Sequence, residues 1–187
     1  MSTGDELLKA VVVEKSGISS DFCTLRLQLE GGARTFTPGS HTSLQTPFGW
    51  RNYSLANLAD GDTRELGIKA ERDGRGASSW IVDTLKEGDY IQCQAPNNTF
   101  PLKDADAYLL IAGGIGITPI LSMAKTLSHV NLDFVLHYFV RSEGHTAFAS
   151  EVSAFEQNAN LHVLSLIHIS EPTRPERISY AVVCLKK

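Results

Sequence analysis

The stretch "YLLIAGGIGITPILSM", residues 108–123, decides the fold. It begins with a short, continuous apolar run, which is typical of a strand buried on both faces of a parallel sheet. Three glycines follow, and then Thr118 and Pro119 suit the start of a helix. Threonine can cap a helix, and proline lacks only an N–H group that the first helical turn leaves unpaired. The stretch therefore predicts a strand, a glycine turn and a helix in succession.

The glycine turn itself has two interpretations. Glycine lets a backbone approach a ligand closely, and the helix start that follows favours a phosphate. A tight turn without any ligand would have the same pattern, and the spacing is not that of the GxGxxG fingerprint.

The chain downstream continues in the same manner. Residues 133–140 read as a second buried strand, residues 146–158 as a helix and residues 161–166 as the start of a third strand. Alternation of strand and helix indicates a parallel, doubly wound α/β unit.

The chain upstream has a different period. Along residues 22–30, Cys23, Leu25, Leu27 and Leu29 alternate with more polar positions, as in a half-buried strand. Similar short runs, broken by Gly and Pro, occupy residues 7–15, 35–47, 51–57, 64–72 and 88–96, with a helix expected at 78–88. These runs predict a small antiparallel β-barrel. We therefore expect a barrel domain at 1–103, a parallel α/β unit at 104–163 and a separate tail at 164–187.

Composition excludes several classes of function. The 187 residues carry a formal net charge of −4, which disfavours a nucleic-acid partner. No apolar run approaches the about 18 residues of a membrane span, and the N-terminus lacks the pattern of a secretory signal. Cys23, Cys93 and Cys184 are too far apart for a metal cluster and fit a reducing cytoplasm. We expect a cytoplasmic protein with no membrane partner and no metal site.

Two further stretches carry possible binding chemistry. "GWRNYSLAN", residues 49–57, places an arginine, a tyrosine and a serine in a run that otherwise reads as a strand. "DGRGASS", residues 73–79, opens a helix with two glycines, an arginine and two serines. Each alone could be a surface feature: an arginine beside a core tyrosine, or a solvated loop.

The order of these motifs resembles the ferredoxin–NADP reductase superfamily, in the branch of phthalate dioxygenase reductase and vanillate demethylase reductase. "RNYSL", "GRGAS", "NNTFPL" and "GGIGITPILSM" follow one another as in that branch, and the resemblance covers residues 7–163. It implies an antiparallel flavin-binding barrel followed by a parallel α/β dinucleotide-binding domain. It also implies a flavin-dependent NAD(P)H oxidoreductase, the reductase component of a Rieske-type oxygenase or demethylase, which passes hydride from NADH to flavin and then single electrons to an iron–sulfur centre.

The resemblance assigns the flavin contacts. Arg51 would bind the flavin phosphate, Tyr53 would lie against the ring or ribityl chain, and Ser54 would sit near N5 as the nearest residue to a catalytic side chain. Residues 67–72 would line the ring. The other flavin-binding candidates are Asn52, Lys69, Ala70, Gly74, Arg75, Gly76, Ala77 and Ser78. FMN is usual in this branch, whereas FAD occurs elsewhere in the superfamily.

The resemblance also assigns a nicotinamide site. The candidates are Gly113, Gly114, Gly116, Thr118, Arg141 and Ser142. The branch favours NADH. Arg141 could instead receive the 2′-phosphate of NADPH, and it could equally be a solvated loop charge. His41 lies where the superfamily often has a residue near the flavin edge, while His137 reads as a core histidine.

Three functions remain open at this point. The chain could serve an oxygenase component, or it could reduce free flavin or a separate ferredoxin, or it could be a non-catalytic flavin-binding module. Close relatives carry a 2Fe-2S domain with C-x₄-C-x₂-C spacing, and this sequence has no such cluster. We expect that domain, if any, only in a missing C-terminal part.

The tail from Leu164 resembles translated sequencing adapter. "LSLIHISEPTR" and "ISYAVVCLKK" each match an adapter half, separated by a barcode-sized "PER". Pro172 and Pro175 would break any regular element there. We therefore expect the natural protein to continue past Val163, and the chain as given to have an open sheet edge, poor solubility and little NADH-dependent activity. Resequencing the source locus tests this prediction, which an uninterrupted genomic reading frame for 164–187 would refute.

Overall fold

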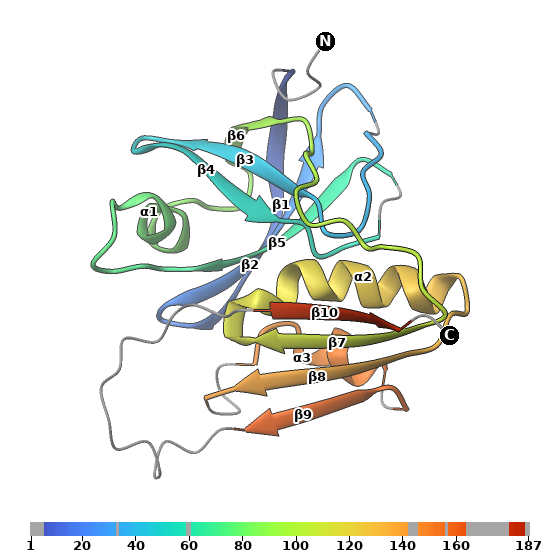
Figure 1. The fold of residues 1–187 in the computed structure, drawn as a ribbon. Helices are drawn as coiled ribbons and strands as arrows, with labels where there is room; N and C mark the ends of the chain where they lie inside the picture. Colours follow the sequence, from blue (N-terminus) through green and yellow to red (C-terminus); the bar gives the residue numbers. More distant parts are fainter. Residues whose placement is uncertain are drawn as a thin grey trace.

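The computed structural model describes residues 6–32, 34–58, 61–141, 146–155, 157–163 and 180–185. The chain forms two units that pack against each other, a β-barrel and an α/β unit (Figure 1). The barrel elements are β1 (Leu7–Ser19), β2 (Phe22–Leu29), β3 (His41–Thr46), β4 (Gly49–Ser54), β5 (Thr63–Lys69), α1 (Ala77–Asp83) and β6 (Tyr90–Gln94). The second unit contains β7 (Ala107–Gly113), the 3₁₀ turn η2 (Gly114–Gly116), α2 (Ile117–His129), β8 (Phe134–Val140), α3 (Ala149–Ser153), β9 (Ala159–Val163) and β10 (Tyr180–Leu185).

The barrel is a single antiparallel sheet with strand order β4-β3-β6-β1-β2-β5, as the sequence predicted. Its interior is aliphatic, because the alternating residues of β2 and its neighbours all turn inward: Cys23, Leu25, Leu27 and Leu29 are buried. Strands β4 and β5 are the two edges of this sheet, and they meet only at a bridge between Leu55 and Leu66.

Phe22 departs from the predicted alternation. Its ring is buried, although the sequence pattern assigned it to the outer face of β2. It packs into the core of the second unit together with Ala56, since that part of the barrel surface is covered by α2 and its neighbours. Two barrel residues therefore belong to the core of the second unit, while the barrel interior forms a core of its own.

The second unit has a parallel sheet, β7-β8-β9, with α2 between the sheet and the barrel (Figure 1). Two details differ from the sequence prediction. Thr118 does not cap α2: the turn η2 leads straight into the helix, Gly116 is the N-cap residue, and the Thr118 hydroxyl donates to the carbonyl of Ile115 at 3.2 Å. The helix expected at 146–158 is shorter, because Phe148 adopts a left-handed conformation immediately before it.

The tail contributes an element that the sequence analysis did not expect. Strand β10 pairs antiparallel with β7, from Tyr180 opposite Ala112 to Leu185 opposite Ala107. The tail thus covers one side of β7, whereas β9 is an edge strand of the described sheet, in keeping with the expected open edge. Residues 164–179, which contain both tail prolines, lie outside the described residues. Within the described ranges, no helix combines the length and apolar character that crossing a bilayer requires.

Lys15 of β1 holds the C-terminal end of α1. Its ammonium group donates to the carbonyls of Ile81, Val82 and Leu85 at 3.0, 2.7 and 2.6 Å. These carbonyls lie at or just beyond the helix end, where the last C=O groups have no partner within the helix. A lysine from a distant strand thus fixes the helix that follows residues 73–76.

We expect Lys15→Met to lower the free energy of unfolding by about 1–3 kcal/mol, since it leaves part-buried carbonyls without a charged donor. Urea denaturation followed by circular dichroism measures the change. Lys86→Met, an exposed lysine in the next turn, is the matched control and should change stability by less than about 0.5 kcal/mol. Equal losses in the two variants would contradict the capping role.

Candidate functional site

A cleft of about 720 Å³ lies between the two units. One wall comes from β4, β5 and the loop that leads into α1, and the other from η2 and the start of α2. The lining residues are Arg51, Asn52, Tyr53, Ser54, Gly67, Lys69, Glu71, Asp73, Gly74, Arg75, Ala77, Ser78, Ile115, Gly116, Thr118 and Pro119. Because β4 and β5 are the sheet edges, the cleft opens where the barrel is not closed by strand pairing.

Most of the candidates from the sequence line this cleft. Those in the lining are Arg51, Asn52, Tyr53, Ser54, Lys69, Gly74, Arg75, Ala77, Ser78, Gly116 and Thr118. Those outside the lining are Ala70, Gly76, Gly113, Gly114 and Arg141. Ser142 lies outside the described residues. Arg141 is exposed just beyond the end of β8.

Five lining residues were not among the individual candidates: Gly67, Glu71, Asp73, Ile115 and Pro119. Gly67 and Glu71 fall in the range 67–72 that the resemblance assigned to the flavin ring. Ile115 and Pro119 belong to the quoted glycine turn and helix start. Asp73 is the first residue of the quoted "DGRGASS" stretch, so position in the motifs was the available signal for each.

The cleft carries cationic side chains that are not neutralised by ion pairs. Among the described residues, Arg51, Lys69 and Arg75 form no ion pair. One Arg51 nitrogen donates to the carbonyl of Trp50 at 2.6 Å, which leaves the rest of its guanidinium fork for a ligand. Two carboxylates, Glu71 and Asp73, share the lining. The three cationic side chains outnumber the two carboxylates in the lining, so the cleft suits a ligand with one anionic group in a defined place.

The loop before α1 is held in a fixed shape. The Glu71 N–H donates to the Ser78 hydroxyl oxygen at 3.0 Å, and the Gly74 N–H donates to the Glu71 carbonyl at 3.0 Å. Arg72 ties the loop to the barrel through Asp21 at 2.9 Å and to α1 through Asp83 at 2.5 Å. The cradle is therefore preformed.

Glycine is required at the tightest point of this loop. Gly76 has a φ of +91°, and a Cβ there would lie 2.9 Å from the ring of Phe48. A Cβ at Gly74 would lie 2.9 Å from the Glu71 carbonyl oxygen. A side chain at either position would overlap with these neighbours, so the loop can keep this shape only with glycine.

Tyr53 presents a neutral phenol. Its ring packs against the barrel core, and burial raises the pKa of its hydroxyl to about 12, while the charge of Arg51 opposes the shift. Ser54, the next residue, pairs with His41 across β3 and β4. Burial lowers the pKa of His41. Ser54, Asn52 and His41 also line a second cavity of about 200 Å³, which adjoins the cleft through Asn52, Ser54 and Pro119.

The opposite wall approaches β5 closely at Gly67. A Cβ at this position would lie 2.8 Å from Thr118 Cγ2 and 3.0 Å from both Ile115 Cδ1 and Phe148 Cε2. The absence of a side chain thus lets the glycine turn contact the barrel. The turn is also tied to β8, because the Tyr138 hydroxyl donates to the Gly114 carbonyl at 3.1 Å. The described residues contain no group of three or more potential metal ligands.

Comparisons with known proteins agree with this geometry. The profile of the oxidoreductase FAD-binding domain matches residues 9–101. Phthalate dioxygenase reductase from Burkholderia cepacia is 35% identical over 165 residues, which is 85% of this chain and 51% of the relative. Vanillate O-demethylase oxidoreductase from Pseudomonas putida is 36% identical over 162 residues, covering 83% of this chain and 51% of the relative.

A solved structure shares the architecture of both units. It is phthalate dioxygenase reductase, described as a modular structure for electron transfer from pyridine nucleotides to a 2Fe-2S centre. It superposes with a TM-score of 0.80 at 32% identity, over 91% of this chain and 54% of that one. The chain thus spans about half the length of these relatives. It carries an oxidoreductase FAD-binding domain, has a ferredoxin–NADP reductase-like fold, and is homologous to phthalate dioxygenase reductase and vanillate O-demethylase reductase.

Proposed function

We propose that the chain is the flavin- and nicotinamide-binding part of an NAD(P)H-dependent oxidoreductase that supplies electrons to an oxygenase component. One observation carries this proposal: the cleft brings the "RNYS" strand, the glycine loop before α1 and the glycine turn before α2 to the same space. These three segments are far apart in the sequence, and nothing in the barrel fold alone requires them to meet.

The residues present fit a flavin. Arg51, Arg75 and the Gly74–Ser78 loop form a cationic, glycine-lined cradle for its phosphate. Tyr53 offers a flat neutral ring, and Ser54 offers a hydroxyl that can donate or accept. We favour FMN, as the resemblance implies, and FAD is the alternative for which the matching domain is named.

The chain's own residues act by placement. A bound flavin would supply the hydride-accepting and electron-transferring chemistry. Arg51 and the loop would hold the phosphate, Tyr53 would lie against the ring, and Ser54 would offer a hydrogen bond near N5. Gly116 and Thr118 line the same cleft and would border the place of a nicotinamide. Such positioning is the main way in which a protein accelerates transfer between two bound rings.

We propose NADH as the electron donor and an oxygenase component or a ferredoxin as the acceptor. Relatives named as reductases of oxygenase systems support the acceptor class. Arg141 lies beyond β8, at the carboxyl end of a parallel strand, where NADPH would find a cation for its 2′-phosphate. Comparing NADH and NADPH as donors tests that choice directly.

A binding experiment tests the flavin site. The chain is mixed with FMN or FAD, freed of unbound flavin by gel filtration, and examined for flavin absorbance. We expect one flavin per chain, with FMN retained better. Absence of retained flavin with both compounds would overturn the proposal.

Ser54→Ala is expected to leave flavin binding nearly unchanged and to slow flavin reduction by NADH about tenfold, the effect of losing roughly one hydrogen bond near the reacting atom. The measurement is stopped-flow bleaching in a chimaera that joins residues 1–163 to the C-terminal half of phthalate dioxygenase reductase. Reduction by dithionite, which needs no nicotinamide site, is the control. Unchanged bleaching by NADH would remove Ser54 from this role.

A further inference from the structure

The width of the cleft depends on how α2 lies against β5. One wall contains Gly67 and Lys69 of β5, and the other contains Thr118 and Pro119 of α2. Ser122 and Lys125 follow Thr118 at helical spacing, so the three side chains share the face of α2 toward the barrel. A displacement of this helix along β5 would therefore change the cleft.

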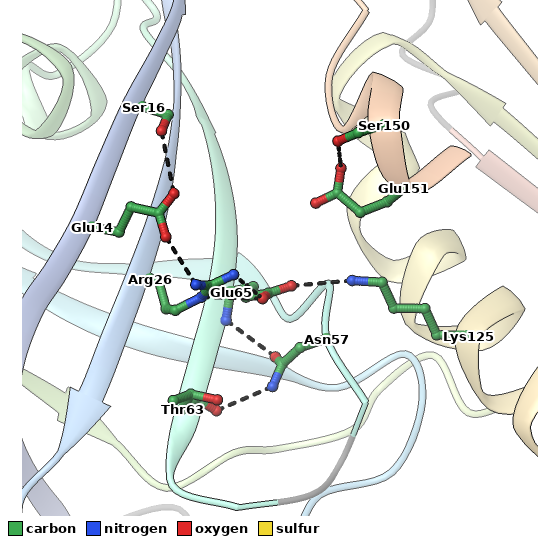
Figure 2. A network of polar contacts seen from close by, with 9 residues as sticks. All are labelled: Glu14, Ser16, Arg26, Asn57, Thr63, Glu65, Lys125, Ser150 and Glu151. Carbon is green, nitrogen blue, oxygen red and sulfur yellow. Dashed lines mark hydrogen bonds and ion pairs between the residues drawn. The ribbon is translucent and has the colours of Figure 1, made fainter. Parts of the chain in front are cut away.

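An ion-pair network fixes this packing (Figure 2). The Glu65 carboxylate, on β5, accepts from Lys125 Nζ at 3.1 Å and from Arg26 NH2 at 3.0 Å. Arg26 in turn binds Glu14 at 2.9 Å. Lys125 is the member that comes from the second unit, and Figure 2 shows it reaching from α2 toward Glu65.

The pair between the units is more shielded than the other ion pairs. The Glu65 and Lys125 side chains are each 19% exposed, whereas those of Lys9 and Glu30 are 53% and 48% exposed. Shielding from water and salt strengthens the attraction between two charges. Removing Glu65 would leave the Lys125 ammonium partly buried without its ion-pair partner, whereas removing Lys125 would leave Glu65 paired with Arg26 alone. The pair therefore favours one position of α2 against β5.

Asn57 supports the contact between β5 and α2 through both its side chain and its backbone carbonyl. Its side-chain oxygen accepts from the Glu65 N–H at 3.1 Å, and its amide donates to the Thr63 carbonyl at 3.1 Å. The Asn57 carbonyl accepts from the buried Ser122 hydroxyl at 2.9 Å. Strand β5 and helix α2 are therefore joined at two points, one charged and one neutral.

We propose that Glu65 and Lys125 are positioning residues that set the width of the cleft. Lys125 lies two turns from Thr118 along α2, which rises about 1.5 Å per residue. A displacement of the helix at Lys125 would therefore also move Thr118. The ion pair thus fixes how far the glycine turn stands from the "RNYS" strand. Its consequence for catalysis rests on the proposed function, whereas its effect on cleft geometry does not.

The geometric test is a distance measurement without cofactors. Spin labels at Gln92→Cys on β6 and His129→Cys at the end of α2 report the separation of the units, since both positions are exposed. Cys23 and Cys93 are buried, and Cys184→Ser removes the remaining thiol. We expect Lys125→Met to raise the fraction of longer distances about fivefold, the effect of losing about 1 kcal/mol. Lys125→Arg should keep the parent distribution, and so should Lys9→Met, which breaks an exposed pair within the barrel.

The functional test uses the chimaera described above. Lys125→Met should retain flavin, because Lys125 does not line the cleft. It should lower the rate of flavin reduction at saturating NADH in proportion to the loss of the shorter spin-label distances. An unchanged distance distribution, or a changed distribution with an unchanged reduction rate, would overturn the proposal. Failure of the parent to retain flavin would instead refute the proposed function while the distance result stands.

Discussion

Gly39→Ala is expected to lower the free energy of unfolding by about 3 kcal/mol or more, because left-handed strain and steric overlap add at this position. Gly39 has a φ of +89°, and a Cβ there would lie 1.9 Å from the Phe100 carbonyl oxygen and 2.8 Å from Met123 Cε. The methionine side chain can move. The Phe100 carbonyl belongs to the backbone that leads from the barrel into the second unit. Displacing it would shift this connection and would cost free energy.

A matched variant separates strain from overlap. Gly88 has a φ of +86°, and no atom lies within 4 Å of the place that a Cβ would take, so Gly88→Ala adds strain alone, about 1–2 kcal/mol. Chemical denaturation of both variants gives the difference. If the two variants lose the same stability, the link at Phe100 adjusts without cost, and the contact does not constrain the junction.

Arg51→Ala is expected to weaken flavin binding by about 1.5–3 kcal/mol, or roughly 10- to 150-fold in Kd, since it removes a charge-assisted contact to the phosphate. The guanidinium is available for this contact, because Arg51 forms no ion pair among the described residues and its one backbone hydrogen bond is local. Arg51→Lys should recover only part of the affinity, since lysine cannot form the two-pronged contact.

Fluorescence titration of FMN measures these affinities. Arg34→Ala is the control, because Arg34 pairs with Glu6 on the exposed surface of the barrel and lies outside the cleft lining. Riboflavin, which lacks the phosphate, should bind the parent and Arg51→Ala equally. An equal loss of riboflavin and FMN affinity would show that Arg51 supports the ring or the fold, and not the phosphate.

The strands of the barrel could be predicted because period-two alternation is a local property. Leu25, Leu27 and Leu29 had to face one side, and they do. Phe22 could not be assigned in the same way, since it is buried in the core of the second unit, whose residues lie more than 80 positions further along the chain. Thr118 was predicted as a cap because the residue type suits one, but Gly116 takes that place through a 3₁₀ turn that no side chain signals.

The candidate site was likewise predictable only in part. The "RNYS" strand and the glycine loops were named from their order in the chain, and the structure brings most of these residues to the cleft. The closeness of Gly67 to Thr118 and the pairing of Glu65 with Lys125 were not predicted, since neither residue type nor spacing reveals contacts across about 50 to 60 positions.

The place of Phe22 and Ala56 in the core of the second unit has a consequence for synthesis on the ribosome. The barrel's own core is complete once β6 has emerged, but Phe22 and Ala56 belong to the core that contains α2, and this helix emerges some seconds later at typical translation rates of about 5–20 residues per second. During that interval, a newly made barrel presents an aromatic ring and an apolar surface without a cover. The nascent chain therefore passes through a stage that invites chaperone binding, and the arrival of α2 ends it.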